Sequence, residues 1–273
     1  MAGDIHDRAA QSLRLFDTYV TELRQKAGGG DFDETYYTKH RARFGQTLSV
    51  LPAAHRSGAR ALELGATDFI QVALRHLYGY DEVIGTQFTQ RIEEKLYRKA
   101  LSVGGLSTEN LTTSVNLEQE LLPLPDGTLD LALCCEVLEH MDIDPMFMLG
   151  ELNRVCASGA ALVLTTPNCC SARNFWKIAN GYRPHFFMQY EISRSPYRHN
   201  VEWDVHAVAQ LARAAGFEPE RLETHDLFEP PHLEGIALLR KNNLPLEHRG
   251  DCIIMLARKV SDVVDRWPAG IYI

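Results

Sequence analysis

One short group of side chains has the chemistry of a metal site. Glu136, Glu139 and His140 are spaced so that a helix there would present all three on one face. Two carboxylates and an imidazole can together ligate a divalent cation. The ordinary structural alternative is that Glu139 caps or pairs locally and that His140 is a buried, hydrogen-bonded histidine. The spacing alone leaves both interpretations open.

A predicted strand-to-helix junction carries the second group of candidate residues. Glu63 places a carboxylate at the end of a short apolar run, and Gly65 allows a sharp turn and the close approach of a ligand. The chain has no G-x-G-x-x-G motif, which argues against a dinucleotide, and no G-x-x-x-x-G-K-[ST] motif, which argues against nucleoside triphosphate hydrolysis.

The elements that must position these residues alternate between apolar runs and helical patterns. The predicted strands cover residues 59–64, 82–86, 112–115, 129–135, 160–166, 218–224, 235–239 and 251–257. The predicted helices cover residues 1–27, 34–51, 69–77, 144–156 and 205–215, with a short one over 260–265. This alternation predicts an α/β protein with a parallel, doubly wound sheet.

Residues 168–200 interrupt the alternation with aromatic and polar side chains. Such a segment after a parallel strand lies where open α/β sheets bind ligands. We expect it to form a lid, which also packs on the core through its aromatic rings. The side chains that suit a polar ligand are Trp176, Tyr182, Arg183, His185, Tyr190, Arg194 and Tyr197.

Composition excludes several classes of protein. The formal net charge of −8 opposes a nucleic-acid partner, because nucleic-acid binders normally have a basic face. No run of about 18 apolar residues predicts a membrane span, and the acidic N-terminus does not read as a signal peptide. The six cysteines include no C-x-x-C, so we expect free thiols and a reducing cytoplasm.

Four further strings, taken in order with the Glu63 junction, resemble the class I S-adenosylmethionine (SAM)-dependent methyltransferases. They are LPLPDGTLDLAL at 122–133, EVLEH at 136–140, ELNRV at 151–155 and ALVLTTPN at 161–168. The resemblance covers roughly residues 59–260. It implies a Rossmann-like fold with a seven-stranded, mostly parallel sheet, N-terminal helices, and a lid inserted after the fifth strand.

The resemblance also implies which residues contact SAM. Glu63 and Gly65 would face the amino-acid half of the cofactor, and Asn116 and Leu117 would flank the adenine. The family usually has an acidic residue after the second strand to hold the ribose hydroxyls. Here Gln87 occupies that place, and it can hydrogen-bond but has no charge. The remaining cofactor contacts implied are Ala66, Thr67 and Glu136.

A later string, HNVEW at 199–203, resembles a second motif of the small-RNA 3′-terminal 2′-O-methyltransferases. In that family the matching residues hold a magnesium ion, which implies a site of Glu136, Glu139, His140 and His199 for magnesium or manganese. Such a cation would lower the pKa of a hydroxyl nucleophile. The resemblance makes Glu139, His140 and His199 the catalytic candidates, with His140 and then His199 as the base if not a ligand.

The acceptor that fits these features is a saccharide or another vicinal diol. The chain also resembles methyltransferases of bacterial polysaccharide clusters, and a mannoside is one specific possibility. Two other classes stay open: a metal-independent methyltransferase of a small metabolite, and a SAM-binding protein without catalysis. We divide the chain into an N-terminal helical segment (1–58), a methyltransferase domain (59–260) and a tail (261–273). A homodimer is compatible with the sequence.

Overall fold

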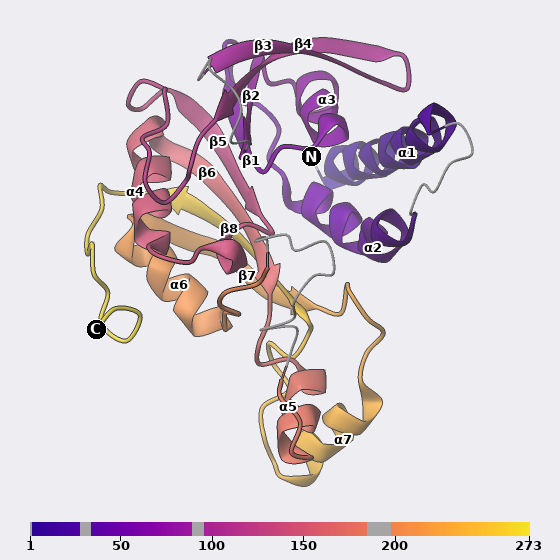
Figure 1. The fold of residues 1–273 in the computed structure, drawn as a ribbon, viewed down its shortest axis with the longest axis vertical. Helices are drawn as coiled ribbons and strands as arrows, with labels where there is room; N and C mark the ends of the chain where they lie inside the picture. The colour runs from indigo at the N-terminus through magenta and orange to yellow at the C-terminus, as the bar shows by residue number, and fades with distance from the viewer. Residues whose placement is uncertain (1, 28–33, 89–95, 185–197) are drawn as a thin grey trace.

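A mixed sheet of eight strands forms the centre of the protein in the computed structural model, which describes residues 2–27, 34–88, 96–184 and 198–273 (Figure 1). The strands are β1 (Arg60–Leu64), β2 (Glu82–Gln87), β3 (Leu96–Val103), β4 (Leu106–Ser114), β5 (Leu129–Cys135), β6 (Cys156–Pro167), β7 (Phe217–His225) and β8 (Cys252–Lys259). Their order is β3-β4-β2-β1-β5-β6-β8-β7. The pairs from β4 to β6 are parallel, whereas β3, β7 and β8 pair antiparallel.

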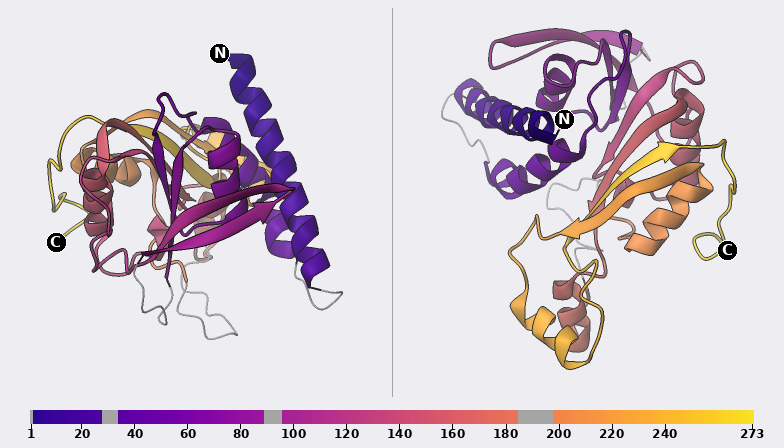
Figure 2. Two further views of the ribbon diagram at one scale, coloured as in Figure 1. Left: turned by 90° about the horizontal axis from the view of Figure 1, so that it is seen from above. Right: turned by 180° about the vertical axis from the view of Figure 1, so that it is seen from behind.

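Helices cover both faces of this sheet (Figure 2). They are α1 (Ala2–Lys26), α2 (Thr35–Val50), α3 (Asp68–His76), α4 (Pro145–Val155), α5 (Ala172–Ala179), α6 (Val205–Ala214) and α7 (Leu233–Lys241), with one 3-10 turn, η1 (Leu138–His140). Helices α1, α2 and α3 lie on one face, and α4 and α6 on the other. The doubly wound α/β prediction is confirmed.

The sheet has eight strands where seven were expected, because an edge hairpin was missed. Gly104 and Gly105 both have positive φ and join β3 to β4, which is the conformation that a two-residue hairpin turn requires. The expected strand at 112–115 is only the end of β4.

Two predicted elements near the C-terminus were wrong. Residues 235–239 belong to helix α7, not to a strand, since the side chain of His232 caps the backbone N–H of Gly235. A Cβ on Gly235 would meet the carbonyl oxygen of Ala172 at 2.1 Å, so this glycine allows α7 to lie against α5. Residues 260–265 form bends and no helix.

An aromatic cluster attaches the N-terminal helices to the sheet. The ring of Phe16 on α1 lies 5.1 Å from those of Phe44 on α2 and Phe69 on α3, centroid to centroid. All three rings are buried. Burial of rings of this size is the main stabilising contribution to such a contact. Helices α1 and α2 therefore share the core of the sheet.

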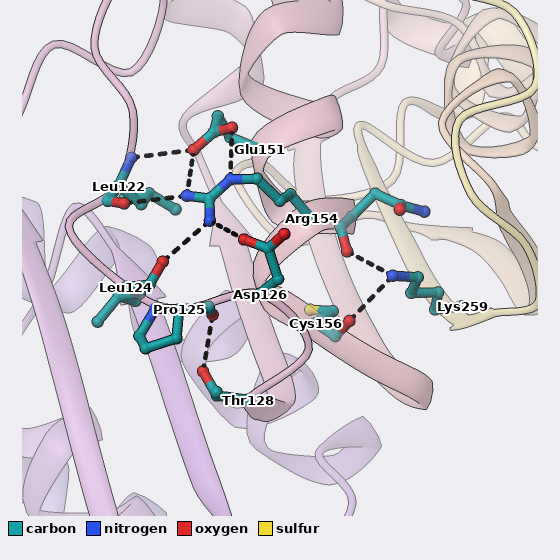
Figure 3. Close-up of polar contacts among 10 residues, drawn as sticks. Leu122, Leu124, Pro125, Asp126, Thr128, Glu151, Arg154, Cys156 and Lys259 are labelled. Carbon is teal, nitrogen blue, oxygen red and sulfur yellow. Dashed lines mark hydrogen bonds and ion pairs between the residues drawn. The ribbon is translucent and has the colours of Figure 1, made fainter.

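Arg154 anchors the loop that precedes β5 to helix α4 (Figure 3). Its guanidinium pairs with Glu151 at 2.7 Å and with Asp126 at 2.5 Å, and it donates to the carbonyls of Leu122 and Leu124. Glu151 also accepts from the backbone N–H of Leu122 at 3.0 Å. Loop and helix are thus held as one unit at the end of the sheet opposite to the candidate site.

The predicted insertion leaves the sheet at the carboxyl end of β6. Helix α5 follows directly and packs with α7 beyond that end of the sheet (Figure 1). Residues 185–197, which include the predicted lid side chains His185, Tyr190, Arg194 and Tyr197, lie outside the described residues. The lid therefore stays a prediction.

All six cysteines are free thiols, as expected. Among the described residues, none of the helices has the length and apolar character needed to cross a membrane.

Candidate functional site

Glu63 is a buried carboxylate at the junction of β1 and α3. Its Oε1 accepts a hydrogen bond from the Thr67 hydroxyl at 2.9 Å, and its Oε2 has no hydrogen-bond partner among the described residues. Burial raises the pKa of Glu63 to about 8. A buried carboxyl oxygen without a donor is suited to a ligand that brings a cationic group.

The loop after Glu63 is fastened to the end of β2. Gly65 has φ +61°, a conformation that side chains rarely adopt, and its N–H donates to the Thr86 hydroxyl at 3.1 Å. The N–H of Ala66 donates to the Thr86 carbonyl at 2.9 Å. The chain can turn sharply here and leave the carboxyl ends of β1 and β2 open to a ligand.

A cavity of about 280 Å³ opens at the carboxyl ends of β1, β2, β4 and β5. Five of the eight predicted cofactor residues line it, namely Gly65, Gln87, Asn116, Leu117 and Glu136, together with His140. Glu63, Ala66 and Thr67 do not line it; Glu63 is buried, whereas Ala66 and Thr67 are partly exposed. The structure thus brings five of the eight predicted SAM contacts to one cavity, and their contact with the cofactor stays a prediction.

The loop that would flank the adenine is held in shape by its own side chains. Asn116 accepts from the N–H of Glu118 at 3.0 Å and its own N–H donates to Glu120 at 2.8 Å. Glu118 Oε1 accepts from the N–H groups of Ile143 and Asp144, both at 2.7 Å. The loop after β4 is therefore tied to the start of α4.

Glu136, Glu139 and His140 do not lie on an α-helix. Glu136 has φ +57°, in the left-handed region, and only the 3-10 turn η1 follows before α4 begins at Pro145. The three side chains therefore do not share a helix face. This backbone conformation directs the Glu136 side chain to β6, where its Oε1 accepts from the Thr165 hydroxyl at 2.8 Å.

Glu139, His140 and His199 do come together. One ligand atom from each lies within 4.8 Å of the other two, and the two imidazole centroids are 5.2 Å apart. Glu139 is fully buried; its Oε2 accepts from Thr166 at 3.0 Å, and its Oε1 lies 3.9 Å from His140 Nε2. We call these residues the triad. Glu136, the fourth residue of the predicted metal site, is not in this group.

Backbone hydrogen bonds bring His199 to its place. The N–H of Asn200 donates to the Glu139 carbonyl at 2.8 Å, and the Asn200 side chain donates to the His140 carbonyl at 2.9 Å. The indole of Trp203 donates to the Leu138 carbonyl at 3.3 Å. Segment 198–203 is thereby attached along η1.

Each histidine of the triad is oriented through its Nδ1 atom. His140 Nδ1 lies 3.0 Å from the Arg198 carbonyl, which can only accept, so Nδ1 donates and Nε2 carries the lone pair. His199 Nδ1 lies 3.2 Å from Glu202 Oε1, whose side chain is buried. This arrangement of ring and partner is common around metal-binding histidines.

Burial, followed by the charge of Glu136, raises the pKa of Glu139 well above its usual range. A buried carboxyl oxygen, Oε1 of Glu139, is also without a hydrogen-bond partner among the described residues. A divalent cation between Glu139 and the two Nε2 atoms would satisfy that oxygen. The donor set of the triad therefore fits a cation.

Sequence reasoning missed the residues that support these groups. On β6, the hydroxyls of Thr165 and Thr166 donate to Glu136 and Glu139. The string HNVEW contains Glu202, which had been given no role and which contacts His199. No pattern in the sequence singles out Arg43 on α2. It is 3% exposed, and the charges of Glu136 and Tyr36 raise its pKa although burial acts to lower it.

Comparisons with known proteins agree with this architecture. A protein of Streptomyces fradiae, "Uncharacterized 37.1 kDa protein in transposon TN4556", is 29% identical over 233 residues, which are 78% of this chain. The chain spans 57% of the length of that relative.

Two solved structures share the fold. The S-adenosylmethionine-dependent methyltransferase of Mesorhizobium loti has a TM-score of 0.50 at 15% identity, covering 80% of this chain and 97% of its own. A SAM-dependent methyltransferase of Archaeoglobus fulgidus has a TM-score of 0.50 at 17% identity, covering 88% and 100%. A family model described as a methyltransferase domain matches residues 36–222. Because that match takes in more than half of the sequence, the chain belongs to the family with this methyltransferase domain, for which SAM is the cofactor.

Proposed function

We propose that the chain transfers a methyl group from SAM to a hydroxyl of a saccharide or related vicinal diol, with a divalent cation held by the triad. The observation that supports this most directly is the position of His140. Its side chain lines the cofactor cavity and also belongs to the triad. A methyl donor in the cavity and a hydroxyl at the triad would then be neighbours.

In the proposed reaction the bond between the methyl carbon and the SAM sulfur would break, with its electron pair left on sulfur to give S-adenosylhomocysteine, as a bond forms to the acceptor oxygen. The proton of that oxygen would pass to His140 or His199, or to solvent where both histidines hold the cation. Glu63 would hold the ammonium end of SAM, and Gln87 would hydrogen-bond the ribose. Displacement needs the methyl group in line with the acceptor oxygen at about 3–3.5 Å, and these two residues would orient the cofactor for it. Glu136, at the wall of the cavity, stays a predicted cofactor contact.

A cation at the triad would act as a Lewis acid that makes a sugar hydroxyl easier to deprotonate. Two imidazoles and one carboxylate suit manganese, iron or cobalt at least as well as magnesium, which prefers oxygen ligands. With Glu136 outside the triad, more of the coordination shell is left for two adjacent acceptor hydroxyls. Where both histidines act as ligands, neither serves as the base.

A saccharide fits the polar and aromatic character of the segment after β6. Trp176 and Tyr182 lie stacked, with ring centroids 6.5 Å apart and an interplanar angle of 10°. Aromatic faces of this kind pack on sugar rings, and Arg183 adds a hydrogen-bond donor nearby in sequence. A mannoside of a bacterial polysaccharide is the specific acceptor proposed. A cytoplasmic location and a homodimer stay predictions.

Methyl transfer to a panel of glycosides tests the proposal. The wild type should methylate at least one glycoside with a vicinal diol, EDTA should abolish the reaction, and manganese or magnesium should restore it. The variant His199→Ala should lose transfer at an unchanged melting temperature, because His199 lies on a surface segment. His206→Ala, on the exposed start of α6, is the matched control.

Activity in EDTA would instead select a metal-independent methyltransferase. Binding of SAM without turnover on any hydroxylated compound would select the non-catalytic binding protein.

A further inference from the structure

A second cavity of about 220 Å³ lies beyond the carboxyl end of β6, beside α5. Its walls include Asn168, Ser171, Arg173, Asn174, Lys177 and Phe228, and we call it the α5 pocket. It shares no lining residue with the cofactor cavity. Helix α5, which carries Arg173, Asn174 and Lys177, lies with α7 beyond the end of the sheet (Figure 1).

Asn174 gives the α5 pocket a buried hydrogen-bond acceptor. The residue is 1% exposed and its Nδ2 donates to the Asn168 carbonyl at 3.2 Å. Its Oδ1 is buried and has no hydrogen-bond partner within the described part of the chain. An unsatisfied buried oxygen is costly, so this wall favours a ligand that brings a hydroxyl or amide donor.

The charges around the α5 pocket balance one another. Asp251 accepts from the N–H groups of Leu227 at 2.7 Å and Glu229 at 2.9 Å, and the Glu229 carboxylate lies 3.4 Å from Lys39. Arg173 donates to the Pro230 carbonyl at 2.8 Å and lies near Asp226. With cations and carboxylates both present, the pocket favours a neutral ligand rich in donors and acceptors over a simple ion.

Phe228 adds an apolar wall. Its ring is half-buried and packs against the core beside α2, with a centroid 5.6 Å from that of His40. A flat aromatic face among amides, a guanidinium, an ammonium and carboxylates suits a sugar ring, which has one apolar face and a rim of hydroxyls.

Two elements connect the α5 pocket to the reaction site. On β6, Thr166 holds Glu139, and Asn168 at the pocket follows two residues later, about 7 Å along the strand direction. On α2, His40 contacts Phe228, and Arg43, about 5 Å further along the helix axis, lies near Glu136. The pocket is therefore within reach of one extended acceptor that begins at the triad.

We infer that the α5 pocket binds a sugar unit of the acceptor other than the one that is methylated. This inference rests on the proposed function and narrows it, because the acceptor would be an oligosaccharide or polysaccharide end and not a free monosaccharide. Asn174 would accept from a hydroxyl, Lys177 would donate to another, and Phe228 would pack on the ring.

Equilibrium binding of trisaccharides tests this without any need for turnover. The probes are α-linked trimers of mannose, glucose and galactose, titrated by calorimetry into the protein with S-adenosylhomocysteine present. The wild type should bind at least one trimer. Lys177→Gln and, separately, Phe228→Leu should weaken that binding about tenfold, as expected for the loss of a charge-assisted hydrogen bond or of a ring face. Lys241→Gln, exposed on α7, is the matched control and should bind like the wild type.

Phe228→Leu keeps an apolar side chain against the core, so both variants should fold, and their melting temperatures check this. Equal trimer affinities in the wild type and both variants would overturn the inference, as would a wild type that binds none of the trimers. Pocket-dependent binding without any methyl transfer would instead contradict the proposed function and leave the pocket assignment standing.

Discussion

Glu63 is a buried carboxyl whose ionisation costs the protein stability. Burial raises the pKa of Glu63 from 4.5 to about 8, so between these values the folded chain binds more protons than the unfolded chain. Stability therefore falls as the pH rises from about 4.5 towards 8. Perturbed groups of this kind cluster at functional sites, and under the proposed function the ammonium of SAM would pair with this charge.

We predict opposite effects of Glu63→Gln on stability and on binding. Removing the ionisable group should raise the free energy of unfolding at pH 8 by about 1–3 kcal/mol, an order-of-magnitude figure from the pKa shift. Cofactor affinity should fall by about 1.5–3 kcal/mol, because the ammonium loses its charged partner. Urea unfolding and calorimetry with SAM measure the two, with exposed Glu234→Gln as the control. An unchanged dissociation constant would refute the assignment of this junction.

Glu202 should act on the cation only through His199. The Glu202 carboxylate lies 3.2 Å from His199 Nδ1, so Glu202→Gln leaves a hydrogen-bonding side chain but no charge to orient the ring. Loss of such a partner typically weakens metal binding about 10–100-fold. Manganese titration followed by electron paramagnetic resonance gives the affinity, and exposed Glu247→Gln should behave as the wild type. Equal manganese affinities in Glu202→Gln and the wild type would contradict this role.

At the scale of elements, the sequence predicted what periodicity and apolar runs determine. The run 129–135 became β5, buried almost throughout, and the helix expected over 144–156 became α4, with Asp144 as its N-cap. The short run 235–239 could not be assigned by periodicity, since five apolar or small residues fit a strand and a helix turn equally. Residues 235–239 form a helix that packs against α5, and such a tertiary contact is not visible in a short run of sequence.

The candidate site could be predicted only in part, because tertiary contacts also decide which of its residues meet. Glu139, His140 and His199 meet because segment 198–203 attaches to η1 through Asn200, an arrangement that spacing along the chain cannot give. Glu136 would share a face with Glu139 and His140 only on a helix, and its left-handed backbone directs it to Thr165 instead. Local backbone conformation at a single non-glycine residue leaves little trace in a sequence.

Helix α1 should depend on its aromatic contact with the sheet. We predict that Phe16→Ala lowers the free energy of unfolding by about 3–5 kcal/mol, because the cavity would lie between the buried rings of Phe44 and Phe69. Leu121→Ala removes an apolar side chain that is 64% exposed and should change stability by less than about 0.5 kcal/mol. Urea unfolding of both variants measures their free energies of unfolding. A small effect of Phe16→Ala would mean that the contact of α1 with the sheet contributes little to stability.

In the whole molecule, the two functional regions come from different parts of one sheet edge. The predicted cofactor contacts lie at or just after the ends of β1, β2, β4 and β5, whereas the triad is built from η1 and the segment before α6, with Glu139 hydrogen-bonded to β6. Among the described residues, only His140 belongs to both. Parallel strands that end at the same edge allow this, since each strand adds side chains to a common surface without changing its neighbours.

This separation predicts that cofactor and cation bind almost independently. Stripping the protein with EDTA should change the dissociation constant of S-adenosylhomocysteine less than about threefold, because one shared side chain can transmit little coupling free energy. Linkage requires the same factor in reverse, so saturating S-adenosylhomocysteine should change manganese affinity equally little. Calorimetry of both ligands, each with and without the other, measures the full cycle.

His140→Ala should weaken manganese binding strongly and cofactor binding slightly, whereas His199→Ala should weaken manganese binding alone. Loss of cofactor binding in EDTA would contradict the separation and would mean that the cation contacts the cofactor directly.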